Sequence, residues 1–507
     1  MPPPMSDPAA PPTEPPASQG LARAAASGVA WTTLAKVVSQ ATGIGVTLLL
    51  ARLLTPRDFG LVGMVSVFSG FVALLGELGF GAALVQRSEL EERHLSTVFW
   101  FNSAAGLVLG AAMAAAAPLL AEFYGEPKLI GLTRAVALSF VIMPLGAVHQ
   151  AVLSRKLGFK SLAWVDTAVA LLSAVVAVIA ALRGLGPWAL VLRSLTVAGA
   201  GVVGLWLVAG WRPRVLFDAR ALKELLGFSA NLFAFNAVNY WARNGDQLLI
   251  GKFLGAASVG IYARAYSTMT MPISEVTSVL TKVMFPTLSR LQHRHDELRA
   301  LYLRSLQNIA LLTFPLMSVL LAVASPFVLS VFGPNWAEVV PVLQVLCPVA
   351  MLQSIGTTVG WIYQATGRTD VMFRYGAIVS PLILGSIGVG VALGSPLTVA
   401  IAYAVMNLVI LPYPQFAVAG RLIGLRPLQV LSAVKASLAH SVAASVPAWA
   451  VGAYLPAPHL VRFVAGALTG LGLYAAIVHG LRAPAYLRLR EQLGEMLRSR
   501  SGKVSER

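Results

Sequence analysis

The stretch NYWARNGDQLLIGKFLG, residues 239–255, carries an arginine and an aspartate one helical turn apart inside a long apolar segment. An ionisable side chain inside a hydrocarbon layer costs several kcal/mol, so Arg243 and Asp246 are expected to face a cavity or a partner. The rest of the chain is equally apolar, since 57% of its 507 residues are hydrophobic and 12% are charged. An average soluble domain has roughly 25% charged residues, so this composition indicates a membrane protein with many spans.

Apolar segments long enough to cross a membrane recur along the chain. A helix needs about 20 such residues to cross a hydrocarbon core of roughly 30 Å. We count fourteen segments, at residues 28–51, 59–84, 97–121, 131–153, 161–182, 186–209, 229–250, 258–286, 305–331, 338–364, 373–393, 396–417, 432–454 and 460–481. Only helices and closed barrels satisfy every backbone polar group in lipid. We therefore expect an all-α polytopic membrane protein with about 14 transmembrane helices.

The chain repeats itself at an offset of 200 residues. Residues 28–80 and 228–280 share a layout of long span, short outer loop and long span, and APLLAEFYGEP (117–127) matches SPFVLSVFGPN (325–335). An even number of spans in each half makes the repeats parallel, related by an axis along the membrane normal. We expect a disordered Pro/Ala-rich tail (1–24), an N-terminal six-helix lobe (25–210) and a cytoplasmic linker (211–228). A C-terminal six-helix lobe (229–420), helices 13 and 14 (421–482) and a basic amphipathic tail (483–507) follow.

The formal net charge of +17 raises the question of nucleic-acid binding. If the N-terminus is cytoplasmic, the cytoplasmic loops and both tails hold 26 of the 38 Lys and Arg, and the opposite side holds 6. Such an excess is typical of cytoplasmic loops in membrane proteins. The charge therefore orients the protein in the membrane, with both termini in the cytoplasm, and we expect no nucleic-acid partner.

Catalytic motifs are missing from the sequence. GDQLLIGK (245–252) has five residues between its glycines where a phosphate-binding loop has four, and Phe253 replaces the Ser or Thr that binds magnesium. The seven histidines are scattered and Cys347 is the only cysteine, so we expect no metal site and no cofactor. Every expected outer loop is short, which leaves no room for an external catalytic domain. We predict a protein that is not an enzyme.

Polar side chains form stripes along several of the expected spans, at the i, i+3, i+4, i+7 spacing of one helix face. The stripe of the seventh span is Asn236, Asn239, Tyr240, Arg243, Asp246 and Gln247. The eighth span has Arg264, Thr268, Met271, Glu275, Ser278 and Lys282, and the first has Lys36 and Gln40 among others.

The rise of 1.5 Å per residue converts these positions into depth. Arg243 and Arg264 both fall roughly 21 Å from the inner surface, Arg193 of the sixth span is level with them, and Lys36 lies at about 12 Å. Together they predict a basic cavity between the two halves, which would bind an anion. The alternative is that Arg243, Asp246 and Arg264 neutralise one another and join two helices. Glu77 and Lys282 lie near the cytoplasmic ends of their spans, and we expect them to pair when the inner side closes.

At these residues the sequence resembles a known family of exporters. The motifs that carry the resemblance are ARLLTPRDFGLVGM (51–64), LGFGAALVQR (78–87), HLSTVFWFN (94–102), RNGDQLLIGKFLG (243–255), VGIYARAY (259–266), VMFPTLSRLQ (283–292) and ATGRTDVMFR (365–374). They are similar to the polysaccharide branch of the multidrug, oligosaccharidyl-lipid and polysaccharide exporter superfamily, in its lipopolysaccharide or colanic acid exporter-like group. The resemblance covers roughly residues 25–480.

The resemblance implies a flippase that moves undecaprenyl-pyrophosphate-linked oligosaccharide across the bacterial inner membrane by alternating access, for O-antigen, capsule or exopolysaccharide. Its expected partners are that lipid, membrane lipids and polysaccharide polymerase or export machinery. We expect the pyrophosphate on Arg243, Arg264, Lys36 and Arg193, and sugar contacts from Asn236, Asn239, Tyr240, Gln247, Tyr266 and Gln40. Asp246 and Glu275 would be charge partners or coupling residues, and Glu77 and Lys282 the cytoplasmic gate.

Two other functions stay open. A multidrug or small-solute antiporter of the same superfamily would share the fold, but it would be expected to have an acidic cavity for cationic drugs. A non-transporting scaffold of the polysaccharide machinery would not require charges at matched depths.

Overall fold

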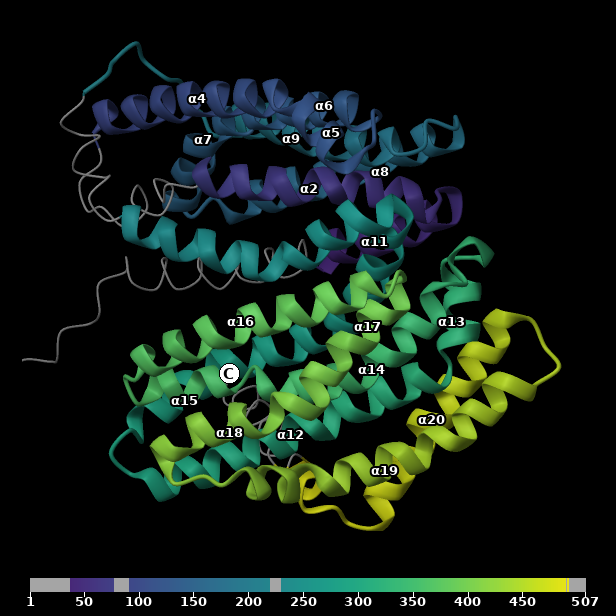
Figure 1. Cartoon of the computed structure of the whole chain (residues 1–507). Helices are drawn as coiled ribbons and strands as arrows, with labels where there is room; N and C mark the ends of the chain where they lie inside the picture. The colour runs from purple at the N-terminus through teal and green to yellow at the C-terminus, as the bar shows by residue number, and fades with distance from the viewer. Residues whose placement is uncertain (1–36, 77–90, 219–228, 489, 492–507) are drawn as a thin grey trace, which may run out of the picture. The chain divides into compact units, whose positions relative to one another are not determined.

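The computed structural model describes residues 37–76, 91–218, 229–488 and 490–491, except for the side chains of residues 229–239, 242, 279, 282, 283 and 285. The described residues form helices and connecting turns, with no strand among them (Figure 1). The helices are Val37–Leu53, α2 (Pro56–Gly76), α4 (Glu92–Ala115), α5 (Ala117–Tyr124), α6 (Leu129–Ile142), α7 (Pro144–Arg155), α8 (Phe159–Leu182), α9 (Trp188–Val208), α11 (Ser229–Arg290), α12 (His295–Ala322), α13 (Ala324–Val331), η1 (Pro334–Trp336), α14 (Val339–Gly356), α15 (Val359–Ala365), α16 (Thr369–Ala392), α17 (Pro396–Val405), η2 (Met406–Ile410), α18 (Pro412–Gly420), η3 (Arg421–Ile423), α19 (Pro427–Tyr454) and α20 (His459–Gly480).

The described helices confirm the all-α membrane fold. Ten of them are long and apolar enough to cross a membrane, or up to eleven if the pair Pro396–Ile410 and Pro412–Ile423, bent by 40°, is one span. The helix Val37–Leu53 is apolar but shorter, and α19, which covers the expected thirteenth span, is not among the ten. The number fourteen therefore stays a prediction. The two tails lie largely outside the described residues, which begin at residue 37 and end at residue 491.

Two compact units make up the chain. Unit 1 falls within Met1–Thr47, Phe71–Ala117 and Gly131–Phe235, and unit 2 within Leu48–Gly70, Pro118–Ile130 and Asn236–Arg507. Unit 2 thus takes two short pieces from the first half of the chain. The predicted lobe boundaries follow sequence repeats rather than contacts, and they stay a prediction.

The internal repeat has a visible counterpart in the helices. A long helix followed by an eight-residue helix occurs twice, as α4 with α5 and as α12 with α13. Each short helix is followed by a glycine with positive φ, Gly125 at 69° and Gly333 at 98°. Glycine has no Cβ and adopts this left-handed conformation at no steric cost. The two matching sequence segments therefore fold in the same way.

The expected outer loop between the seventh and eighth spans is a kink inside one long helix. Helix α11 runs from Ser229 to Arg290 and is non-helical only at Gly255, where φ is 80° and ψ is 177°. Beyond the kink, a Cβ on Gly260 would lie 1.9 Å from the Pro56 carbonyl oxygen, and a Cβ on Gly60 would lie 1.7 Å from the Ala256 carbonyl oxygen. Two glycines thus allow α2 and α11 to touch backbone to backbone within unit 2.

Aromatic side chains hold unit 1 together around the middle of α7. The ring of His149, fully buried, stacks on Trp206 with centroids 4.6 Å apart. Trp211 meets His149 edge-on at 5.1 Å, and Phe99 of α4 contacts all three rings. This cluster anchors the residues that follow α9.

Candidate functional site

Unit 1 contains a cavity of about 600 Å³ between the helix Val37–Leu53, α8 and α9. Its size is within the usual range for pockets that bind small molecules, roughly 300–1,000 Å³. The residues that line it are Ser39, Gln40, Gly43, Phe159, Leu162, Ala163, Asp166, Val169, Ala170, Ser173, Arg193 and Val197. The cavity is therefore apolar along most of its wall, with one cationic and one acidic side chain.

Helix α8 presents opposite faces to this cavity and to its surroundings. Large apolar side chains are exposed along one face, at Trp164, Leu171, Leu172, Val175, Ile179 and Leu182. The cavity residues Leu162, Asp166, Val169 and Ser173 lie about 180° away, at roughly 100° per residue. An exposed apolar stripe suits lipid, so the cavity is on the side of α8 that faces away from lipid.

Arg193 lines this cavity within unit 1, whereas the sequence predicts a basic cavity between the two halves, so its predicted role in binding pyrophosphate stays a prediction. Its side chain is half-buried, and a Cβ on Gly43 would lie 3.9 Å from its Nη2 atom, so the absent side chain leaves the guanidinium room. Gln40 lines the same cavity. Among the described residues Arg193 makes no ion pair, and burial is the only influence found on its charge.

Asp166 is a cavity residue that the sequence analysis did not select. It lines the cavity from α8, and it forms no ion pair with a described residue. The signal was present in the sequence, because Asp166 lies opposite the large apolar stripe of α8 and on the same face as Ser173.

Unit 2 has a separate polar cluster on α11, α14 and α17. Gln353 Nε2 donates a hydrogen bond of 2.6 Å to Tyr403 Oη, and the Tyr266 ring lies 6.1 Å from the Tyr403 ring. Tyr262 stacks on Tyr266 at 6.0 Å, and its buried hydroxyl has no hydrogen-bond partner. Asp246 is close enough to all three tyrosines to interact with them electrostatically. The structure thus brings Asp246 and Tyr266 of the predicted site together.

Arg243 is exposed at the edge of this cluster and interacts electrostatically with Tyr266. Among the described side chains it forms no ion pair with Asp246, although the two are one helical turn apart. The Asp246 carboxylate instead accepts a hydrogen bond of 2.7 Å from the Gln247 backbone N–H.

Arg264 has a different environment, an aromatic cage made by Phe59, Phe332 and Trp336. Its Cζ atom lies 4.6 Å from the Phe59 ring centroid and 5.3 Å from each of the other two. Its Nε atom is buried and has no hydrogen-bond partner among the described residues. Trp336 is itself fully buried and donates from Nε1 to the Ala51 carbonyl at 2.6 Å. The cage holds Arg264 through ring faces, and its predicted role toward pyrophosphate stays a prediction.

Two further predicted sugar contacts of the seventh span face α2. Tyr240 Oη donates a hydrogen bond of 2.6 Å to the Val67 carbonyl, and a Cβ on Gly70 would lie 2.3 Å from that hydroxyl. Gln247 lies beside the same helix, because a Cβ on Gly63 would be 3.9 Å from its Oε1 atom. Both side chains therefore join α11 to α2, and whether they also meet sugars is untested.

Several predicted site residues lie outside the part of the chain that is described. Lys36 and Glu77 fall in such segments, and so do the side chains of Asn236, Asn239 and Lys282. Glu275 is described, exposed, and has an interaction partner. The proposed pairing of Glu77 with Lys282 therefore stays a prediction.

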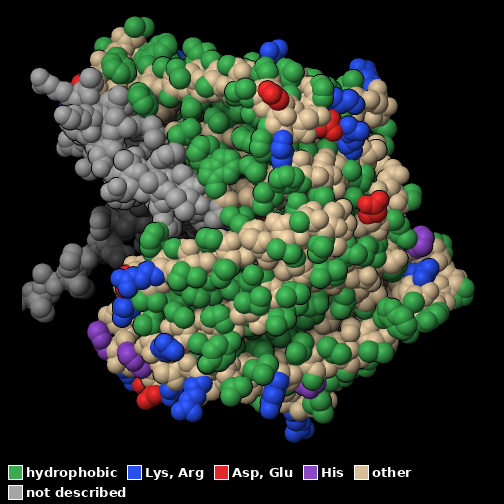
Figure 2. All heavy atoms as spheres, viewed as in Figure 1, with side chains coloured by type: hydrophobic (Ala, Val, Ile, Leu, Met, Phe, Trp, Pro, Cys, Tyr) green, Lys and Arg blue, Asp and Glu red, His purple; other side chains and the backbone are tan. Residues whose placement is uncertain are grey.

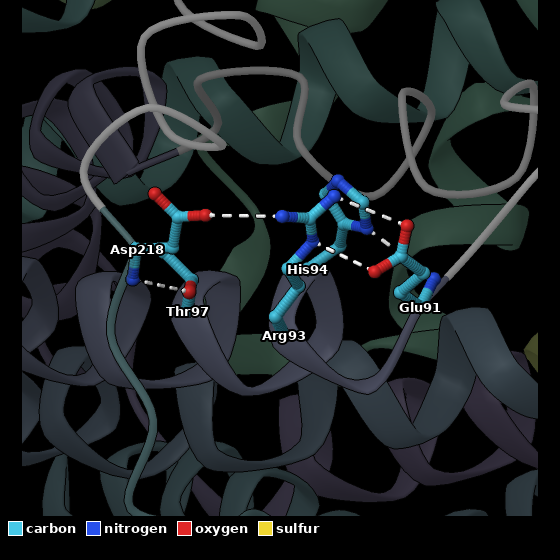
Figure 3. Close-up of polar contacts among 5 residues, drawn as sticks. All are labelled: Glu91, Arg93, His94, Thr97 and Asp218. Carbon is cyan, nitrogen blue, oxygen red and sulfur yellow. Dashed lines mark hydrogen bonds and ion pairs between the residues drawn. The ribbon is translucent and has the colours of Figure 1, made fainter.

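The residues after α9 are fastened to the first turns of α4, and we refer to Trp211–Asp218 as the strap. Thr97 Oγ1 accepts a hydrogen bond of 2.9 Å from the Asp218 N–H, and Arg93 reaches the carboxylates of both Asp218 and Glu91 (Figure 3). The Arg214 N–H donates to Ser96 Oγ at 3.1 Å, and the Trp100 indole donates to the Arg214 carbonyl at 2.8 Å. The Trp211 indole donates to the Glu92 carboxylate at 2.9 Å. Side chains of α4 thus form hydrogen bonds with three backbone groups of the strap, the N–H groups of Arg214 and Asp218 and the carbonyl of Arg214.

Hydrophobic side chains cover most of the surface viewed in Figure 2. Their abundance agrees with the apolar helices, since a lipid-facing surface has no need of charge. No group of three or more His, Cys, Asp or Glu that would hold a metal ion occurs in the described part of the chain.

Comparison with known proteins places the chain in a family. The family model described as "Polysaccharide biosynthesis protein" matches residues 49–341. The teichuronic acid biosynthesis protein TuaB of Bacillus subtilis (strain 168) is 32% identical over 385 residues, 76% of this chain and 80% of that protein. The lipopolysaccharide biosynthesis protein WzxC of Escherichia coli (strain K12) is 26% identical over 389 residues, 76% of this chain and 78% of that protein.

A solved structure has the same fold. The lipid II flippase MurJ, in an inward closed conformation, superposes with a TM-score of 0.64 over 89% of this chain and 99% of that chain, at 14% identity. At this identity the likeness shows the fold alone. The family model and the teichuronic acid relative carry the assignment: the chain belongs to the polysaccharide biosynthesis protein family.

Proposed function

We propose that the protein is a flippase that moves undecaprenyl-pyrophosphate-linked oligosaccharide repeat units across the bacterial inner membrane by alternating access. The products would serve the synthesis of a cell-surface polysaccharide. Both termini would lie in the cytoplasm, as the distribution of Lys and Arg indicates. The names of the relatives, teichuronic acid and lipopolysaccharide biosynthesis proteins, support the polysaccharide part of this proposal.

One observation carries the proposal: two arginines on transmembrane helices make no ion pair among the described residues. Arg193 lines the cavity of unit 1, and Arg243 is exposed beside the tyrosine cluster of unit 2. An unpaired cation in a membrane span is costly. An anionic substrate would offset that cost, and it would explain why both halves of the chain retain such a group.

Pyrophosphate suits these two side chains. Its oxygens accept several hydrogen bonds, and a guanidinium donates two parallel ones to such a group. In the proposed cycle Arg193 and Arg243 are the pyrophosphate-binding residues of their own units, the glycan passes through the protein, and the lipid stays in the bilayer. Asp246, beside Tyr262, Tyr266 and Tyr403, would orient Arg243 or bind the coupling cation.

The test is the accessibility of the substrate headgroup in sealed proteoliposomes. The wild type is compared with the double variant Arg193→Gln and Arg243→Gln, and with the control Arg183→Gln, which removes an exposed cap residue of α8. All three are checked for folding by gel filtration and thermal melting. We expect the wild type and the control to move a pyrophosphate-linked oligosaccharide and the double variant to be at least about tenfold slower, since hydrogen bonds to charged groups are worth roughly 1.5–3 kcal/mol.

Other outcomes would replace the proposal. Equal rates for the wild type and a folded double variant would show that the arginines do not bind substrate. Transport of a cationic dye and not of the lipid would indicate a multidrug antiporter. Transport of neither substrate, under imposed proton and sodium gradients, would favour a scaffold of the polysaccharide machinery.

A further inference from the structure

The cavity of unit 1 contains the carboxylate of Asp166, which an anion-binding site does not need. Asp166 lines the same cavity as Arg193, and no ion pair joins them. A carboxylate close to Arg193 would compete with a bound phosphate. The two groups must therefore be far enough apart to serve different parts of one ligand, or the cavity would not suit an anion at all.

Helix geometry separates the two charges along the cavity. Helices α8 and α9 form a hairpin through the turn at residues 183–187. At 1.5 Å per residue, Arg193 is about 8 Å from that turn and Asp166 about 24 Å from it, so their levels differ by roughly 16 Å. The residues between these levels on the cavity face of α8 are small or apolar, namely Val169, Ala170 and Ser173. The cavity thus has a cation near the turn and an acid roughly 16 Å further from it, toward the end lined by Phe159 and Leu162.

The acidic end has the chemistry of a sugar site. A carboxylate accepts hydrogen bonds and donates none, so it matches a group rich in O–H donors, as a sugar ring is. Ser39 and Gln40 line the cavity as further polar groups, and Phe159 and Leu162 supply an apolar wall for the C–H face of a ring. By contrast, an anionic group placed at this end would meet the charge of Asp166 in a partly apolar surrounding, where repulsion is stronger than in water.

We propose that the cavity of unit 1 is a bipolar subsite, in which Arg193 binds the anionic group of the substrate and Asp166 accepts hydrogen bonds from the hydroxyls of a neutral sugar joined to it. This inference rests on the proposed function and adds two things to it. The substrate has a fixed direction along α8. The sugar that reaches Asp166 carries no negative charge, so a uronic acid at that position is rejected.

The test measures binding to the purified full-length protein in nanodiscs, with three probes. They are farnesyl pyrophosphate, farnesyl pyrophosphate linked to a neutral disaccharide, and the same compound with a uronic acid in place of one sugar. The variants are Arg193→Gln, Asp166→Asn and the control Arg183→Gln. Asp166→Asn keeps the shape of the side chain and removes its charge, so packing is preserved.

Each half of the subsite has its own expected result. Arg193→Gln weakens all three probes by about tenfold or more, because the charged donor is lost. Asp166→Asn weakens the neutral disaccharide probe by about tenfold, leaves farnesyl pyrophosphate within about twofold and tightens the uronic acid probe. The control leaves all three unchanged.

The contrary results are distinct. If Asp166→Asn changes all three probes equally, or none of them, Asp166 is not the sugar acceptor and the inference is overturned. If Arg193→Gln binds every probe as the wild type does, the anion lies elsewhere and the cavity is not the subsite. Both results leave the flippase proposal standing. If the wild type neither binds a probe nor moves the lipid in proteoliposomes, the proposed function fails with the inference.

Discussion

Arg193 in unit 1 and Arg264 in unit 2 are both arginines on helices that qualify as membrane spans, yet their surroundings are opposite. Arg193 lines a cavity of about 600 Å³, and glycine at position 43 leaves its guanidinium room. Arg264 is enclosed by the rings of Phe59, Phe332 and Trp336 at 4.6–5.3 Å.

The difference teaches that the depth of an arginine in the membrane does not show whether it stabilises the fold or binds a ligand. A cation over an aromatic face gains roughly 2 kcal/mol or more when it is desolvated, so three rings stabilise Arg264 without an anion. Arg193 has no such compensation from the described residues. We infer that Arg264 maintains the structure of unit 2 and that Arg193 remains available to a ligand. Three predictions test this contrast, and a fourth tests the strap of unit 1.

The largest effect is expected from Trp336→Ala, which removes a wall of the cage. Trp336 is fully buried, and truncation of a buried tryptophan costs about 3–5 kcal/mol. Trp336→Phe is the comparison variant, because it keeps one ring in the cage; it loses the hydrogen bond to Ala51, worth about 1 kcal/mol, and part of the buried indole, so its loss should be smaller than that of Trp336→Ala. The measurement is the apparent melting temperature in detergent. Equal melting of both variants and the wild type would show that the cage is not structural.

The next change compares the two arginines directly. Arg264→Gln should lower the free energy of unfolding by about 2 kcal/mol, since the cation over three rings is lost. Arg193→Gln should change it by less than about 0.5 kcal/mol, because the side chain faces a cavity. Denaturant unfolding of both variants under the same conditions measures the difference. Similar losses for the two would remove the contrast between the units.

In a transport assay, unlike in unfolding, the substitution of Arg193 is expected to have a large effect. Arg193→Gln should slow headgroup translocation by about tenfold or more, and Arg193→Lys should recover only part of it, because an ammonium lacks the planar fork that binds phosphate with two bonds. Rates are measured in proteoliposomes with equal amounts of folded protein. Full recovery by lysine would mean that charge alone is sufficient at this position.

The smallest effect concerns the strap on unit 1. Thr97→Val removes the hydroxyl that accepts from the Asp218 N–H and keeps the shape of the side chain. We expect a loss of about 1 kcal/mol in stability and faster hydrogen exchange at Asp218. Thr167→Val is the control, since the Thr167 hydroxyl only donates to a carbonyl of its own helix. Unchanged exchange at Asp218 would show that the strap does not depend on this bond.

The sequence predicted the features that are local to one helix. Apolar length predicted the all-α membrane fold, which the described helices confirm, because rise and periodicity depend only on neighbours in the chain. Residue counting predicted a basic cavity between the two halves at the level of Arg193, whereas the structure has a cavity lined by Arg193 within unit 1. The predicted binding site therefore stays a prediction.

The environment of Arg264 was not predictable in this way. Its three rings come from positions 59, 332 and 336, far apart in the sequence, and no periodicity links them. Asp166 was interpreted from the sequence as an interfacial charge at the inner end of the fifth span. Apolar length alone does not distinguish the two opposite faces of α8, which the large exposed side chains of one face reveal. The kink at Gly255 was expected as a loop, because a glycine with positive φ does not show in sequence whether the helix resumes directly.

The strap has a consequence for any experiment that divides the gene. A bond between Thr97 and Asp218, and another between Ser96 and Arg214, make the eight residues after Gly210 part of the first half in space as well as in sequence. A first fragment that ends at Gly210 would expose the rings of Phe99 and His149 on which Trp211 packs. A second fragment would begin with residues 211–218, whose hydrogen-bond partners lie on α4. Two separately expressed polypeptides should therefore recombine into a working transporter only when the first one extends through Asp218.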